Sequence, residues 1–300
     1  MRIDGIPKML KKCISRILLF VLATCITLFP SLVNSDLGLA ADSSNIWYPK
    51  PRTTWYWQLQ ETVDTSVEGE VYDIDLFDNT EQVVEELHEK GRKVICYINV
   101  GAYENWREDS EKFTTDGNEP KSDESNLDRN IVGEPYEGWD GEYWLNIKEQ
   151  KVRDIMKSRF EECKRKGFDG VEPDNIDSYY PPEKTGFNIT QEDQINYDQW
   201  LAKTAHDLGL SIGLKNDPGN AEDLVNAFDW ALTEDCFDQN WCGEMKLFID
   251  QGKAVFAAEY TDQMNSTTFT DTVCNQAQQL EFSAILLNRN LDGKPVAKCS

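Results

Sequence analysis

The chain has 300 residues, enough for one large domain or two small ones, and 40% of them are apolar, which suffices for a real core. Its formal net charge of −24 disfavours nucleic acid as a partner and raises the local concentration of cationic partners. Composition and charge therefore favour a globular protein, and the charge fits either a cationic partner or a soluble acidic surface without such a role.

The first 41 residues have the pattern of a leader. Basic residues up to Arg16 precede an apolar run over residues 17–29, which is short for a membrane span and ends at Pro30. This pattern predicts a signal peptide, with a retained signal anchor as the alternative. Residues 42–54 read as a linker and residues 55–300 as the folded domain. We therefore expect a secreted or extracytoplasmic protein with no stable membrane partner once the leader is removed.

Eight cysteines become six when the leader is removed, and an even number in an exported chain predicts disulfides. The first expected pair is Cys236 with Cys242, and a pair of Cys274 with Cys299 would hold the C-terminus. The other two, one on an apolar strand and one on a helix, are expected to be buried thiols; they are Cys96 and Cys163. With two histidines and no C-x-x-C pattern, the sequence predicts no metal site and no cofactor.

The first half of the domain alternates strands with helices. Strands are expected at residues 55–59 and 71–77, a helix at 80–90 that Gly91 stops, and a strand at 93–100. The near-continuous apolar run of that third strand is typical of a strand buried on both faces.

Residues 102–142 are polar and rich in glycine, so we expect a long loop without regular structure, of the kind that is usually functional or mobile. Residues 143–147 return to an apolar pattern. A helix follows, with apolar residues at helical spacing from Val152 to Cys163, and Gly167 ends it.

The second half repeats the alternation. A strand ends where Pro173 stops it, and a capping box of Thr190 with Asp193 starts a helix that Gly209 ends. The remaining expected elements are a strand at 210–217, a short helix capped by Asn220, a strand at 229–234, a helix around 248–249, a strand at 253–260, a helix around 277–280 and a strand at 283–288.

Eight strands that mostly alternate with helices predict a parallel α/β fold, and eight units at this length fit a (β/α)8 TIM barrel. An open doubly wound sheet is the alternative. Nucleotide binding lacks its usual markers, since no G-x-G-x-x-G follows a strand and there is no P-loop.

Acidic residues gather where the central strand ends, over residues 169–179. Glu172, Asp174 and Asp177 follow an apolar strand within six positions, and such carboxylates cost repulsion and desolvation that no fold requires. A solvated acidic loop is the alternative interpretation. Other predicted strands also end on polar side chains, which in a barrel converge on one face. They are Asp73, Asp75, Tyr97, Asn99, Lys215, Asn216, Asp217, Glu234, Glu259 and Tyr260.

Converging carboxylates without histidine or cysteine favour glycosidic bond cleavage, in which one acid protonates the leaving oxygen and the other attacks or activates water. A hydrolase that uses a divalent metal is the competing interpretation, disfavoured because a phosphate-handling site would add arginine or histidine. Lys215 is the one basic group expected in the cleft, either as an ion-pair partner or as a substrate contact. Five tryptophans either offer faces for sugar rings or pack in the core or the barrel floor: Trp55, Trp57, Trp106, Trp139 and Trp144.

Several of these segments, taken in order, resemble glycoside hydrolase family 114 from about Trp55 to Asp292. They are YDIDLFD, KVICYINVGAYENWR, WLNI, DGVEPDNID, GLSIGLKND, Glu-Asp-Cys-Phe at 234–237, and GKAVFAAEY. The resemblance implies a (β/α)8 barrel that cleaves partly deacetylated, galactosamine-containing polymers as an endo-α-1,4-polygalactosaminidase. The partner would then be a cationic amino-sugar polysaccharide, and we expect a monomer.

The resemblance also implies roles for residues. Asp174 corresponds to the nucleophile and Glu234 to the general acid/base, although these roles are exchangeable. The remaining candidates contact substrate, and they are Asp73, Asp75, Tyr97, Asn99, Trp144, Glu172, Asn175, Asp177, Lys215, Asn216, Glu259 and Tyr260. Asn99 and Asn146 depart from the family pattern, which leaves substrate preference open.

A second interpretation keeps the barrel but not the activity, as a catalytically weak protein that binds a cationic exopolysaccharide. Acids at both 174 and 234 favour the enzyme. The substitutions Asp174→Asn and Glu234→Gln separate the two interpretations, because they remove hydrolysis only from an enzyme.

Overall fold

The computed structural model describes residues 46–299 of the protein. The predicted leader and the start of the predicted linker lie outside the described residues. Residues 46–54 contain no helix or strand, so the regular structure begins with the first strand at Trp55.

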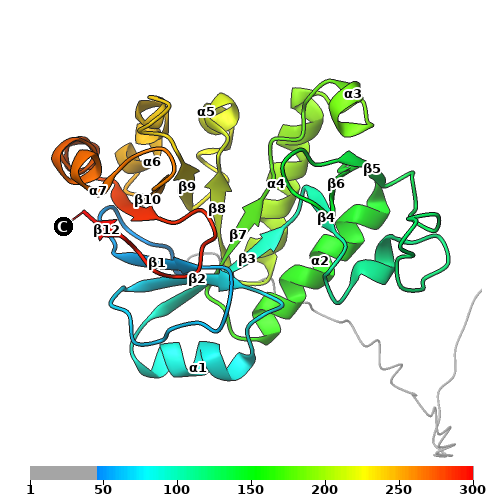
Figure 1. Ribbon diagram of the computed structural model, residues 1–300, viewed down its shortest axis with the longest axis horizontal. Coiled ribbons are helices and arrows are strands. Elements are labelled where there is room, and N and C mark those ends of the chain that lie inside the picture. Colours follow the sequence, from blue (N-terminus) through cyan, green and yellow to red (C-terminus); the bar gives the residue numbers. More distant parts are fainter. Residues whose placement is uncertain (1–45, 300) are drawn as a thin grey trace, which may run out of the picture. The chain divides into compact units, whose positions relative to one another are not determined.

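Eight parallel strands form one curled sheet, and this sheet with its helices is the predicted (β/α)8 TIM barrel (Figure 1). All eight lie where the sequence pattern predicts a strand, within a few residues at each end. In sheet order they are β1 (Trp55–Gln58), β2 (Val71–Asp75), β3 (Lys93–Asn99), β7 (Gly170–Asp174), β8 (Ser211–Lys215), β9 (Trp230–Glu234), β10 (Val255–Tyr260) and β11 (Ser283–Leu287).

The seam of the barrel lies between β1 and β11. In the described part of the chain no ladder joins these two strands, and the Trp55 indole instead donates a hydrogen bond to Ser283 O at 2.9 Å. The short strand β12 (Ala297–Lys298) pairs antiparallel with β11 beside this seam. Side chains and the C-terminal segment thus hold the seam together.

Helices cover the outside of the sheet. Helix α1 packs against β3, α4 against β8, α6 against β10 and α8 against β11 (Figure 1). Within residues 46–299 no helix is both long and apolar enough to cross a membrane. The α-helices are α1 (Glu81–Glu89), α2 (Gln150–Arg165), α3 (Pro182–Thr185), α4 (Gln191–Asp207), α5 (Ala221–Leu224), α6 (Lys246–Asp250), α7 (Ser266–Thr268) and α8 (Cys274–Leu280). Shorter turns are the 3-10 helices η2 (Ser110–Phe113), η3 (Pro218–Asn220) and η4 (Cys242–Met245), and the π-helix η5 (Phe269–Val273).

The expected loop over residues 102–142 is wrong, because this segment forms most of a small antiparallel sheet beside the barrel. The sheet has the order β4 (Ala102–Glu104), β6 (Glu142–Leu145), β5 (Val132–Pro135). Strands of three or four residues are too short to show a period-2 pattern, and β4 pairs with a strand almost forty residues away. In Figure 1 this sheet lies near α2 and α3.

The two helix starts and the strand end predicted from local sequence have different outcomes. The capping box is confirmed, since Thr190 Oγ1 accepts from Asp193 N at 3.1 Å and Asp193 Oδ2 accepts from Thr190 N at 3.0 Å. Asn220 precedes α5, but its side chain donates to Asp217 Oδ2 at 2.8 Å instead of capping the helix. The central strand continues through Pro173, which faces Ile98 in the ladder, and ends at Asp174.

Large side chains fill the barrel interior, so it is a packed core and not a pore. Trp55 stacks on Phe256 with ring centroids 4.8 Å apart, and Trp230 meets the same ring edge-on at 5.6 Å. A Cβ atom at Gly213 would lie 2.5 Å from the Trp230 ring, so only glycine fits beside it. These aromatic rings thus form a floor inside the barrel.

Three disulfides join elements of the domain. Cys236–Cys242 and Cys274–Cys299 are the expected pairs. The expectation that Cys96 and Cys163 are free thiols is wrong: they are bonded, with Cα atoms 6.1 Å apart, and tie β3 to α2. Sequence spacing says nothing about which strand residue meets which helix residue, because that depends on packing.

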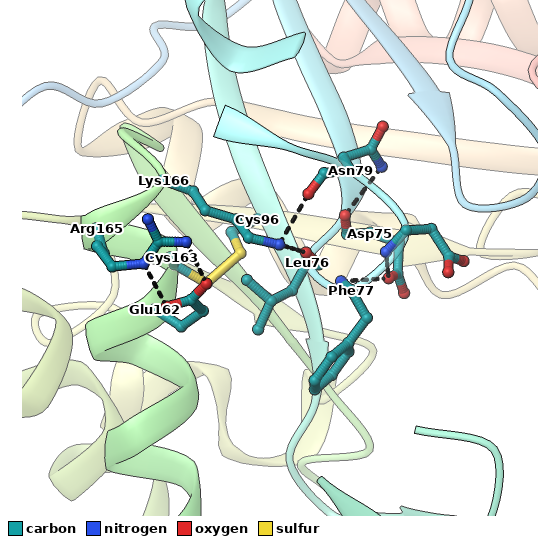
Figure 2. Close-up of a disulfide and its surroundings, with 10 residues drawn as sticks. Asp75, Leu76, Phe77, Asn79, Cys96, Glu162, Cys163, Arg165 and Lys166 are labelled. Atoms are coloured by element: carbon teal, nitrogen blue, oxygen red, sulfur yellow. Dashed lines mark hydrogen bonds and ion pairs between the residues drawn. A yellow bond between two sulfur atoms is a disulfide. The ribbon is translucent and has the colours of Figure 1, made fainter. Parts of the chain in front are cut away.

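Figure 2 shows this third disulfide together with a second link between its helix and the sheet. Beyond the C-terminal end of α2, Lys166 Nζ donates to Leu76 O at 2.7 Å and to Asn79 O at 2.8 Å. These two carbonyls belong to the turn that follows β2. The covalent bond and the ammonium contacts therefore fix α2 against two neighbouring strands.

Candidate active site

Polar residues from neighbouring strands meet at the carboxyl ends of the barrel strands. In the parallel ladders Asp75 lies beside Tyr97, and Asn99 lies beside Asp174. Alternate residues of a strand point to the same side, so Tyr97 and Asn99 on β3 share a face. Asp75, Tyr97 and Asp174 line a cavity of about 240 Å³ together with Lys215 and Glu234.

Lys215 is the centre of the site. Its ammonium nitrogen lies 2.7 Å from Glu172 Oε1, 3.0 Å from Asp174 Oδ1 and 3.2 Å from Glu234 Oε2. The side chain is 3% exposed, and the three carboxylates around it favour its charged form and raise its pKa well above the usual value despite burial. One buried cation thus holds acids from β7 and β9 together.

The contacts of Lys215 also bound the separation of the two candidate catalytic acids. Since Asp174 Oδ1 and Glu234 Oε2 lie 3.0 and 3.2 Å from the same nitrogen, these two oxygens are at most 6.2 Å apart. Glycosidases that retain configuration have carboxyl groups about 5–5.5 Å apart, and inverting ones about 6.5–9.5 Å. The bound for this pair of oxygens admits the retaining separation.

Hydrogen bonds orient both acids. Tyr97 OH donates to Asp174 Oδ2 at 2.9 Å. Asn216 Nδ2 donates to Glu234 Oε2 at 2.7 Å and its Oδ1 accepts from Glu234 N at 2.8 Å, while Tyr260 OH donates to Glu234 Oε1. Each carboxylate is therefore held by neighbours on adjacent strands.

Two asparagines just after strands adopt left-handed backbone conformations. Asn175 has a φ of 60° and Asn216 a φ of 49°, a region that asparagine tolerates better than most residues. The turn at Asn175 lets its amide donate to Asn99 Oδ1 at 3.1 Å, and the turn at Asn216 aims its amide at Glu234. Asparagine at these positions thus serves both the turn and the site.

Beneath the two acids, Asp73 and Glu172 form a buried acidic layer in which neither residue is exposed. Burial raises the pKa of Asp73 well above its usual value, and the neighbouring Glu172 charge adds to this. Burial also raises the pKa of Glu172, against the opposing effect of Lys215. The crowding of these buried acids thus favours a proton on Asp73, while Glu172 pairs with Lys215.

The chain matches the family model of glycoside-hydrolase family GH114 over residues 37–299. It belongs to this family. The protein is therefore a glycoside hydrolase, in agreement with the resemblance of its motifs. No curated protein sequence matches the chain.

Solved structures support the assignment. Ega3 of Aspergillus fumigatus, solved in complex with galactosamine, is 35% identical with a TM-score of 0.75, and the match covers 84% of this chain and 97% of that one. The glycoside hydrolase domain of PelA from Pseudomonas aeruginosa is 14% identical with a TM-score of 0.59, covering 81% of this chain and 97% of that one. The second likeness concerns the fold alone.

Within this GH114 barrel, Glu259 does not face the cavity as a subsite acid would. Its Oε1 accepts from Phe237 N at 2.8 Å and its Oε2 from Asp238 N at 3.2 Å. Neighbouring residues of a strand point to opposite sides, so Glu259 and Tyr260 cannot both face inward. Burial raises the pKa of Glu259 to about 7. The residue supports the loop after β9 and is a structural acid.

Most of the predicted tryptophan faces are unavailable to a sugar. Trp55, Trp57 and Trp144 are each 1% exposed, and of these three only Trp57 contributes to the lining of the cavity. Trp144, predicted to contact substrate, packs between Tyr136 and Tyr180 at centroid distances of 4.4 and 5.4 Å. These three rings are part of the buried core. The two tryptophans that remain open are Trp106 and Trp139, each 52% exposed.

Two further predicted contacts are engaged within the protein. Asp75 Oδ2 pairs with Arg107 Nη2 at 2.8 Å, and its Oδ1 accepts from Phe77 N at 2.7 Å. Asp177 accepts from Tyr180 OH at 2.8 Å, and burial raises its pKa. The Asp75 carboxylate still lines the cavity, and Asp177 lies beyond the residues that line it.

Sequence reasoning missed Glu104, Arg107 and Glu142, which also line the cavity. All three belong to the small sheet or its turns, in the segment expected to be loop. Glu104 and Arg107 stand inside the run KVICYINVGAYENWR that carried the family resemblance, so the motif held a signal that the strand pattern did not.

One group of side chains in residues 46–299 has the composition of a metal site, and it consists of Cys236, Cys242 and Glu259. The two sulfurs are bonded to each other, so they offer no thiolate to a metal. The Glu259 oxygens already accept from backbone amides. This group is therefore a structural unit of the loop after β9.

Proposed function

We propose that the protein is an exported, monomeric endo-glycosidase that hydrolyses an α-1,4-linked, galactosamine-containing polysaccharide, with Asp174 and Glu234 as its catalytic carboxylates. The observation that carries this proposal is the contact of both acids with Lys215 inside one cavity. The likeness to Ega3, which was solved with galactosamine, supports the choice of sugar.

The separation of the two acids supports a retaining mechanism. Asp174 attacks the anomeric carbon while Glu234 gives its proton to the departing oxygen, which breaks the glycosidic bond and leaves the sugar bound to Asp174. Glu234 then takes a proton from water, and the resulting hydroxide displaces Asp174 from the sugar. Tyr97, Asn216 and Tyr260 hold the carboxylates in line for these steps.

The charge of the protein supports a cationic polymer as the substrate. The formal net charge is −24, and deacetylated galactosamine units carry a positive charge when their amines are protonated. Opposite charges gather such a polymer near the cavity, and salt screens this attraction. We expect the affinity for the deacetylated polymer to fall steeply with ionic strength, and an affinity independent of salt would contradict a cationic substrate.

Export is supported by the disulfides. All six cysteines among residues 46–299 are paired, and such bonds persist in oxidising compartments. The leader that would direct export lies outside the described residues. We propose that the mature domain works outside the cytoplasm.

The test is product release from partly deacetylated α-1,4-galactosamine polymer, followed by mass spectrometry. We expect short oligomers from the wild type and from Glu244→Gln, an exposed acid on η4, and none from Glu234→Gln or Asp174→Asn. Polymer that stays bound to the wild type without being cut would contradict the proposal and favour a binding protein.

A further inference from the structure

Two carboxylates face each other across the small sheet. Glu104 on β4 pairs directly with Glu142 on β6, and the two residues are only 2% and 7% exposed. Two ionised carboxylates directly opposite on a ladder would destabilise it, and burial adds a desolvation cost, so the pair favours either a proton on one acid or a cationic ligand. The arrangement is therefore suited to a cationic ligand, since the fold gains nothing from two ionised acids here.

The pair has hydrogen-bonding capacity that the protein does not use. Arg107 Nη2 donates to Glu104 Oε1 at 2.7 Å and to Asp75 Oδ2 at 2.8 Å, so one guanidinium serves two carboxylates. Within residues 46–299, Glu104 Oε2 is buried with no hydrogen-bond partner. Glu142 accepts from the neutral Asn99 amide at 3.2 Å. The group therefore has one cation for three acids.

The same two acids line the cavity that contains Asp174 and Glu234. Trp106 and Trp139, on the turns next to β4 and β6, line it too and are half exposed. A protonated amine has three N–H donors and no acceptor, which suits carboxylates, and indole faces attract cations. The chemistry of this wall thus matches an ammonium group.

We infer that Glu104 and Glu142 form a subsite for the protonated amine of a sugar unit bound beside the scissile bond. This inference rests on the proposed function and deepens it, because the subsite selects deacetylated units over N-acetylated ones. An N-acetyl group carries no charge, so it leaves the buried carboxylates without a cation. Glu104 and Glu142 are specificity-determining residues.

The subsite couples ligand binding to proton release. Burial raises the pKa of Glu142 to about 8; the charges of Glu104 and Asp174 add to this, and Arg107 and the Asn99 amide oppose it. The free protein therefore holds a proton on Glu142 at neutral pH. A bound ammonium favours the carboxylate form, so the proton passes to solvent when the amine binds.

The test is titration calorimetry at about pH 6.5, below the pKa of Glu142, in buffers of different ionisation enthalpy. The ligands are an α-1,4-galactosamine tetramer and its fully N-acetylated form, in a Glu234→Gln background that prevents cleavage. We expect proton release with the amine only. We expect Glu142→Gln to lower amine affinity roughly tenfold and to abolish proton release, while the affinity for the acetylated tetramer stays unchanged.

The matched control is Glu134→Gln, an exposed acid on β5 of the same sheet, which should change neither affinity nor proton release. Equal amine affinity and equal proton release in Glu142→Gln would overturn the subsite and leave the proposed function standing. Failure of the background protein to bind either tetramer would overturn both. The comparison of the two ligands in one protein does not depend on the folding of any Glu142 variant.

Discussion

The barrel and the small sheet each contribute a wall to one cavity, by different means. The barrel wall holds Asp174, Lys215 and Glu234 on strands buried by their neighbours, each fixed by hydrogen bonds across the ladder. The wall from the small sheet holds Glu104 and Glu142 on strands of three and four residues, next to two half-exposed tryptophans. In our proposal the chemistry depends on the barrel strands and recognition on the smaller sheet.

The sharpest way to test this division is to remove the cation of the barrel wall with Lys215→Met. The change leaves Glu172, Asp174 and Glu234 close together without a countercharge. Breaking a buried ion pair costs about 3–5 kcal/mol, so the unfolding free energy from denaturant titration should fall by that amount. We also expect kcat to fall by about 10²-fold, since the proposed catalytic acids lose their orientation.

The matched control for Lys215 is Lys203→Met on the exposed face of α4, where the same chemical change should alter stability by less than about 0.5 kcal/mol. A Lys215→Met protein as stable and active as the wild type would contradict the assignment of the chemistry to the barrel wall.

The disulfides offer a second contrast. Cys96–Cys163 closes a loop of 67 residues and fixes β3 to α2. Replacing both cysteines with alanine should therefore lower the unfolding free energy by about 2–4 kcal/mol and largely keep kcat. Cys236–Cys242 closes six residues just after Glu234, so its removal should cost less stability and lower kcat more. Thermal unfolding and initial rates on the same samples separate the two outcomes, and the reverse ranking would contradict the contrast.

Trp106→Ala tests the wall from the small sheet. The ring is 52% exposed, so we expect the unfolding free energy to change by less than about 0.5 kcal/mol. Loss of a cation–π contact of about 1 kcal/mol should raise KM for the deacetylated polymer several-fold and leave kcat unchanged. Steady-state kinetics measure both constants. A fall in kcat with constant KM would assign Trp106 to the chemical step.

A further prediction concerns stability against pH. Burial raises the pKa of Glu142 to about 8 from a usual value near 4.5, so the folded protein binds the extra proton between these values. Stability from this group is present at low pH and is lost as pH rises toward about 8. Glu142→Gln carries no charge, so above this pH it should exceed the wild type by roughly 1 kcal/mol or more. A parallel pH profile for both proteins would contradict this assignment.

The strands of the barrel could be predicted because burial on both faces gives apolar runs, as in β3, and because capping chemistry marks starts such as Thr190. The paired acids were predictable for a related reason, since several carboxylates directly after one apolar strand cost repulsion and desolvation. Family resemblance then selected Asp174 and Glu234 from among them.

What the sequence left open depends on contacts between distant residues. The bond between Cys96 and Cys163 requires a particular strand residue to meet a particular helix turn. The pairing of β4 with β6 brings Glu104 opposite Glu142 across almost forty residues. Glu259 points away from the cavity, where its carboxylate accepts a hydrogen bond from the backbone of the loop after β9. Apolar patterning does not specify this contact.

The most direct test of the catalytic pair is the configuration of the first-formed product. Proton NMR during the first turnovers on a soluble α-1,4-galactosamine oligomer distinguishes the α-anomer from the β-anomer before mutarotation. Because Asp174 Oδ1 and Glu234 Oε2 lie at most 6.2 Å apart, we predict the α-anomer first from the wild type. The β-anomer first would contradict Asp174 as a nucleophile paired with Glu234.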